Sequence, residues 1–182
     1  LIVSQLKFIV EDYNEDALVQ LFPSSLVPVM TSATVPSGNV VSSGDDSGEP
    51  SWHAFNNNFS QRWIPDNTIS DEVSNHSQKY IGWYNTSLSS KKIITGLFLH
   101  SFFPHYSAHW TRLLISFTLE GSLDGTIWNF IEDITFERPD KYYFVSVTNK
   151  TTAYYGFRIV IKAPHDEDAY EGVVNEAILL SH

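Results

Sequence analysis

The spacing of apolar residues limits the folds open to this chain more than any other feature. In the run 113–120 the positions 113, 115, 117 and 119 are apolar, and Phe117 and Leu119 are separated by the polar Thr118. This period of two is typical of a β-strand with one buried face, because successive side chains of a strand point to opposite faces. The pair Asp124-Gly125 follows, and it tolerates the positive φ of a tight hairpin turn. The pattern therefore predicts antiparallel strands joined by short turns.

Short strand-like runs continue over most of the chain. Turn residues separate them, a pattern that indicates an antiparallel sandwich or barrel. The segment 31–51 is rich in Ser, Gly, Pro and Asp, which predicts a long surface loop, and no helix is predicted. The length of 182 residues corresponds to about one domain. The predicted strands are Tyr80–Tyr84, Ile93–His100, Leu113–Glu120, Ile127–Ile134, Tyr142–Val147, Tyr154–Ile161 and Val173–Leu180.

The residue pattern of the first part of the chain differs from that of the rest. Residues 1–25 read as an N-terminal connector that forms one or two strands, and residues 26–182 as the main domain. The alternative is that residues 1–22 are simply the first strands of the same domain. Because the chain starts with Leu1 and no signal-peptide pattern follows, we expect a fragment of a larger protein.

Charge and cysteine content exclude several classes of partner and chemistry. The chain has 11 basic and 21 acidic residues, a net charge of −10, so we expect no nucleic-acid partner. It has no cysteine, which excludes disulfides, cysteine-ligated zinc and a thiol nucleophile. No apolar run approaches the roughly 18 residues of a membrane helix, so we expect no membrane insertion.

Several motifs, taken together and in order, resemble the discoidin or coagulation-factor type C family. The resemblance covers about residues 29–180 and implies an all-β fold, an antiparallel jelly-roll β-sandwich of the galactose-binding-like type that many carbohydrate-binding modules share. The pieces that carry it are Val29-Met30-Thr31-Ser32, Trp52-His53-Ala54-Phe55-Asn56-Asn57-Asn58, Trp63, Tyr80-Ile81-Gly82-Trp83, the run from Phe117 through Glu120-Gly121-Ser122 and Asp124-Gly125 to Trp128, Tyr154-Tyr155-Gly156-Phe157-Arg158-Ile159, and Asn175-Glu176-Ala177-Ile178.

Many members of this family hold a structural calcium ion between the first loop and the closing strand. The resemblance implies Ca²⁺ ligands at Asn56, Asn58, Ser60 and Glu176. Here the loop carboxylate of the family pattern is replaced by the amide of Asn56 and the family glycine by Asn57, and fewer negative ligands lower calcium affinity. The alternative is an Asn-rich turn held by its own hydrogen bonds.

The same resemblance places a ligand in loops at one end of the sandwich. Sugar recognition uses aromatic faces and fixed polar groups, and the segment 100–112 is dense in both. In the alternative interpretation Phe102, Phe103 and Trp110 plug the barrel mouth and Trp63 packs in the core. A third loop, 165–171, contains three consecutive acids and reads as a solvated loop, with a cation or sugar-hydroxyl site as the alternative. The predicted ligand-binding residues are His100, His105, Tyr106, His109, Trp110 and Arg112 in the first loop and Arg62, Trp63 and His76 in the second.

These observations predict a non-enzymatic domain that binds cell-surface glycan or polysaccharide. Its most concrete form is the receptor-binding tip of a phage tail fibre or similar adhesin, extracellular or on a virion surface. Such a tip would form a homotrimer through its upstream fibre. The alternatives are a binding module of a secreted bacterial glycoside hydrolase, which would be monomeric, and a protein-interaction or structural domain of a larger assembly. The aromatic loop would then meet another chain, since interfaces enrich aromatics and Arg.

Overall fold

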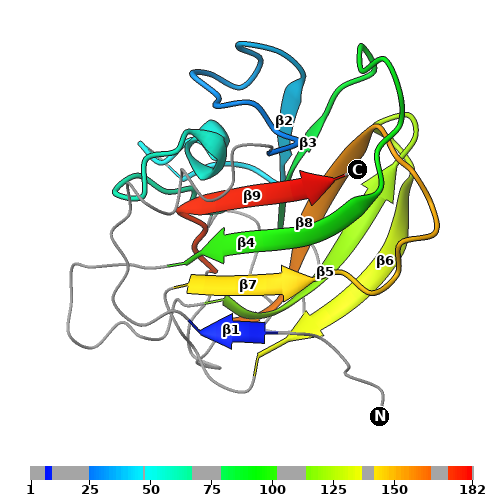
Figure 1. The fold of residues 1–182 in the computed structure, drawn as a ribbon. Helices are drawn as coiled ribbons and strands as arrows, with labels where there is room; N and C mark the ends of the chain where they lie inside the picture. The colour runs from blue at the N-terminus through cyan, green and yellow to red at the C-terminus, as the bar shows by residue number, and fades with distance from the viewer. Residues whose placement is uncertain are drawn as a thin grey trace.

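Two antiparallel β-sheets pack face to face in the computed structural model (Figure 1). The structure describes residues 7–9, 25–46, 48–66, 79–101, 114–136, 142–164 and 172–181, and for residues 7–9, 114–115 and 163–164 only the backbone. One sheet has the strand order β1-β7-β4-β9 and the other the order β2-β3-β8-β5-β6. The elements are β1 (Lys7–Ile9), β2 (Asn39–Ser42), the 3₁₀ helix η1 (Ser51–Phe55), β3 (Tyr80–Tyr84), β4 (Ile94–His100), β5 (Leu114–Ser122), β6 (Trp128–Thr135), β7 (Tyr142–Ser146), β8 (Gly156–Pro164) and β9 (Glu176–Ser181).

The core lies between the sheets and follows the period-two pattern. Phe117 and Leu119 of β5 are fully buried, whereas Glu120 on the other face of the strand is half-buried. On the facing sheet, Leu97 of β4 and Val145 of β7 belong to the same buried cluster. The antiparallel sandwich predicted from the alternation is therefore confirmed.

The Asp124-Gly125 hairpin also forms as predicted. It joins β5 to β6, and Gly125 has a φ of +77°, in the left-handed region that favours glycine. Asp124 accepts backbone N–H bonds from Thr126 and Ile127, both at 2.8 Å. These bonds hold the pKa of Asp124 at about 2.

Two elements lie where the sequence predicted a loop without regular structure. Strand β2 pairs with β3, with Val40 opposite Trp83, and η1 begins at the last residue of the predicted 31–51 loop. The prediction was wrong here because β2 has only two apolar residues, and an outer strand needs pairing on one side alone. Strand β1 pairs with β7 at the edge of the other sheet. The proposed boundary at residue 25 remains a prediction.

The two ends of the sandwich are distinct. At one end β4 finishes and β9 begins, with His100 opposite Glu176, and the residues around Trp63 pack there through the pairing of Trp63 with Val174. We call this the Asn-loop end. At the other end, the hairpin end, the β5–β6 turn lies beside Tyr155, whose N–H donates to the Ser122 carbonyl. Among the described residues, no helix combines the length and apolar character needed to cross a bilayer.

Candidate functional site

The loop at residues 56–61 is tied to the closing strand by a buried carboxyl group. The backbone N–H of Asn57 donates to Oε2 of Glu176 at 2.8 Å, and Asn57 adopts a φ of +56° to make this approach. Glu176 is 2% exposed, and its pKa lies well above the usual range because burial disfavours the charged form more than the N–H bonds of Asn57 and Asn56 favour it. The predicted contact between first loop and last strand therefore exists.

The predicted calcium ligands lie in this loop and on β9, and the side-chain oxygens of Asn56 and Asn58 already accept hydrogen bonds within the loop. Oδ1 of Asn56 accepts the N–H of Asn58, and Oδ1 of Asn58 accepts the N–H of Ser60. Both Asn side-chain amides donate to Oε1 of Gln61, at 2.6 and 3.2 Å. Calcium takes six to eight oxygen ligands and is favoured by carboxylates, and Glu176 is the one carboxylate in this set. The hydrogen bonds favour the alternative of a self-supporting Asn-rich turn.

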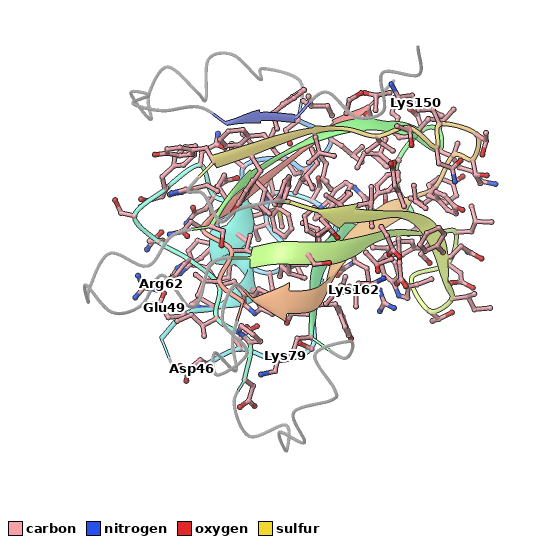
Figure 2. The ribbon with its side chains drawn as sticks, turned by 90° about the horizontal axis from the view of Figure 1, so that it is seen from below. Asp46, Glu49, Arg62, Lys79, Lys150 and Lys162 are labelled. Carbon is pink, nitrogen blue, oxygen red and sulfur yellow. The ribbon has the colours of Figure 1, made fainter. Side chains whose placement is uncertain are left out.

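Arg62 lies next to this loop in a polar cluster. Its Nη2 is 2.9 Å from Oε1 of Glu49, and the Arg62 side chain is 14% exposed. His53 of η1 lies between the two: its Nδ1 is 3.2 Å from the Arg62 carbonyl oxygen and 3.8 Å from Oε2 of Glu49. Figure 2 shows Glu49 and Arg62 side by side at this end, with Asp46 and Lys79 near them and Lys150 far away.

Trp63, another predicted ligand residue, is fully buried. Its indole N–H points to both the Gly44 carbonyl oxygen and Oδ1 of Asp45, each at 3.1 Å. Asp45 in turn accepts the N–H and the hydroxyl of Ser51 at the start of η1. The ring has no free face for a ligand, which favours the core interpretation of Trp63.

His100 is buried at the end of β4. Its ring stacks on Tyr142 at a centroid distance of 4.6 Å and lies 5.3 Å from the Phe59 ring. Its carbonyl oxygen accepts the N–H of Asn175 next to the Asn loop. The structure thus uses His100 to hold Phe59 and the closing strand together.

The other predicted ligand residues lie outside the described residues. The question whether the aromatic residues 102, 103 and 110 plug the sandwich stays open with them, as does the acidic segment 165–171. In the described residues, β5 begins at the Asn-loop end, where β4 ends. Leu114 of β5 pairs there with Pro164 of β8, and the Lys79 carbonyl oxygen just before β3 accepts the N–H of Ile161 of β8. The predicted residues concerned are His76, His105, Tyr106, His109, Trp110 and Arg112.

Sequence reasoning did not identify Glu49, His53 or Asp45 as site residues, although all three lie at this end. Glu49 and Asp45 sit in a segment of Ser, Gly and Asp that carries no periodic signal, so no sequence pattern pairs them with Arg62 or Trp63. Together with Arg62 and the Asn loop, these groups offer a guanidinium, an imidazole, two carboxylates and several amides at the Asn-loop end. Such a set can donate and accept hydrogen bonds to a polar uncharged ligand.

Comparison with solved structures finds the same sandwich in carbohydrate-binding modules, among them modules of family 32. A chitosan-binding module of a chitosanase/glucanase from Paenibacillus sp. IK-5 has 14% identity and a TM-score of 0.60 over 86% of this chain and 98% of that one. A Clostridium perfringens module in complex with GalNAc-β-1,3-galactose has 10% identity and a TM-score of 0.59, over 79% and 94%. The C. perfringens NanJ module in complex with galactose has 8% identity and a TM-score of 0.57, over 78% and 92%.

These likenesses concern the fold. Comparison of the sequence with protein-family models and with curated proteins finds no match. The galactose-binding-like sandwich expected from the discoidin resemblance is confirmed.

Proposed function

We propose that this chain is a non-enzymatic carbohydrate-binding domain that binds glycans outside the cell. The observation that supports this most is the fold, which matches solved sugar-binding modules over most of their length. Loops on rigid β scaffolds commonly carry binding residues. At the Asn-loop end, where β4 ends, Glu49, His53 and Arg62 supply fixed donors and acceptors.

In this proposal the aromatic segment after β4 provides stacking faces and the Arg62 cluster provides hydrogen bonds to hydroxyl groups. Stacking covers the apolar face of a sugar ring, while buried polar groups set orientation. Arg62 is already held by Glu49, so it would be preorganised and lose little conformational entropy on binding.

The test is a glycan array on the isolated chain, run with calcium and with a chelator, followed by Trp110→Ala. We expect this variant to bind its best glycan more weakly by roughly 1–3 kcal/mol at unchanged thermal stability. Tyr155→Ala, which removes a half-buried aromatic ring at the hairpin end, is the matched control. The absence of any glycan binding by the wild-type chain would refute the proposal, and a large loss of stability in Trp110→Ala would make Trp110 a plug of the sandwich.

The finer proposal concerns the protein to which this domain belongs. We propose the tip of a phage tail fibre or similar adhesin, with a secreted glycoside hydrolase as the alternative owner. The relative from a chitosanase/glucanase favours the alternative. Light scattering separates them: a trimer supports the fibre tip, and a monomer supports the appended module.

A further inference from the structure

The outer face of the five-stranded sheet carries aromatic and charged side chains away from the Asn-loop end. Strand order places β3, β8, β5 and β6 side by side. In this register Glu120 of β5 lies between Phe130 of β6 and Arg158 of β8, and Arg158 lies opposite Gly82 of β3. The side chains of Glu120, Phe130 and Arg158 therefore form one row across the strands.

Arg158 is fixed in the middle of this row. Its Nε donates to Oε2 of Glu120 at 2.7 Å, and its guanidinium carbon lies 4.5 Å from the Tyr80 ring centroid and 4.7 Å from that of Trp128. Gly82 leaves the space, since a Cβ there would lie 2.5 Å from the Arg158 Cβ. Among the described residues this Nε bond is the one hydrogen bond from the guanidinium, so its two terminal amino groups remain as donors.

Next to this fixed centre is an exposed ring. Phe130 is 61% exposed and stands two residues after Trp128, on the same face of β6. Exposed large apolar residues also occur in the adjoining hairpin, where Leu123 is 44% and Ile127 is 66% exposed. An exposed apolar patch of this kind on a folded domain commonly marks a binding surface.

Charge on this face is balanced. Glu120 pairs with Arg158, and Asp133 of β6 pairs with Lys162 of β8, which Figure 2 labels. The face therefore offers no excess positive charge to a polyanion, and the net charge of −10 further disfavours one. Rings and paired hydrogen-bonding groups without net charge complement an uncharged ligand that has both apolar C–H faces and hydroxyl groups.

We propose that this sheet face is a second binding surface, for a neutral polysaccharide. The chain lies across β6, β5 and β8, a sugar ring stacks on Phe130 beside Trp128, and hydroxyl groups accept hydrogen bonds from Arg158 and donate to Glu120. This surface consists of strand residues of a rigid sheet, and it needs none of the loops at the Asn-loop end.

The test is affinity electrophoresis of the whole chain in gels that contain galactomannan, mixed-linkage β-glucan or arabinogalactan, with polygalacturonate as the anionic comparison. Three variants separate the contributions: Phe130→Leu keeps an apolar side chain but removes the ring, Phe130→Trp restores a ring, and Val35→Ala, which lies before β2 at the opposite edge of the sheet, is the control for exposed apolar area. We expect roughly tenfold weaker binding to at least one neutral polysaccharide for Phe130→Leu. Phe130→Trp and Val35→Ala should bind like the wild type.

The same gels run in a Trp110→Ala background distinguish this surface from the loop site. Residual binding that Phe130→Leu then removes supports the proposal, even if the loop site proves not to bind sugar. Equal binding by the wild type and Phe130→Leu in both backgrounds overturns it, as does the lack of binding to any neutral polysaccharide. If light scattering finds an oligomer that Phe130→Asp dissociates while polysaccharide binding is unchanged, the face is a protein contact and the proposal is wrong.

Discussion

Replacing Trp63 by Phe tests whether this residue supports the fold or contacts a ligand. The change removes the indole N–H that donates to the Gly44 carbonyl oxygen and to Oδ1 of Asp45, and it leaves a smaller ring in a fully buried site. Loss of a hydrogen bond costs about 1 kcal/mol here, at the low end of the range, because Asp45 is exposed and can be hydrated. The vacated volume of about 40 Å³ adds about 1 kcal/mol at roughly 24 cal/mol per Å³.

We therefore expect Trp63→Phe to lower the free energy of unfolding by about 2 kcal/mol, and the melting temperature by about 4–8 °C for a domain of this size. Urea unfolding and thermal circular dichroism measure this, with Trp52→Phe as the control. The half-buried Trp52 ring packs edge-on to His53, and its replacement should cost under about 1 kcal/mol. Unchanged stability together with lost glycan binding in Trp63→Phe would refute the reasoning and place Trp63 in the binding site.

Three further changes probe other contacts. Glu176→Gln keeps an acceptor for the Asn57 N–H without a buried charge. Because the pKa of Glu176 is raised in the folded state, ionisation of this group costs stability as pH rises above the unfolded pKa of about 4.5, so the variant should melt at a higher temperature than the wild type at pH 7 and at the same temperature at pH 4. A lower melting temperature for the variant, with a difference that disappears when a chelator is added, would instead indicate bound calcium. Gly121→Ala would place a Cβ 2.3 Å from the Tyr154 ring, so urea titration should show a loss of at least about 1–3 kcal/mol, and wild-type stability would contradict this packing. Asp124→Ala should destabilise the hairpin at pH 7. Because the pKa of Asp124 is held at about 2, the difference in stability between the variant and the wild type should shrink as pH falls from about 4 towards 2. A difference in stability that does not depend on pH would exclude the hydrogen bonds of the carboxylate as its cause.

Most of the strands could be predicted from the sequence because their burial pattern is local. The alternation at Phe117 and Leu119 reports which face of β5 is covered, and the Asp124-Gly125 turn reports where the next strand begins. Strand β2 escaped prediction because its place depends on the edge offered by β3, which lies about forty residues further along the chain.

The candidate sites could be predicted only in part, for a similar reason. Arg62 was identifiable as a polar residue next to Trp63, but its partner Glu49 lies in a segment without periodicity. The row across the outer sheet face depends on strand order, since nothing local connects Glu120 with Arg158. The alternation of β8 does predict that Arg158 points away from the core, and that signal could have suggested an exposed functional position.

The closing strand β9 bears on the order in which the Asn-loop end folds. It supplies Glu176 to Asn57, 119 residues earlier in the sequence, and the residue before it, Asn175, bonds to the Phe59 carbonyl. Contacts over such sequence separations form late, because a long loop must close first. During synthesis, strands β2 to β8 could pair before β9 is available, but the Asn loop would still lack its anchor. The Asn loop would therefore reach its final conformation only after β9 has been synthesised and has paired with β4.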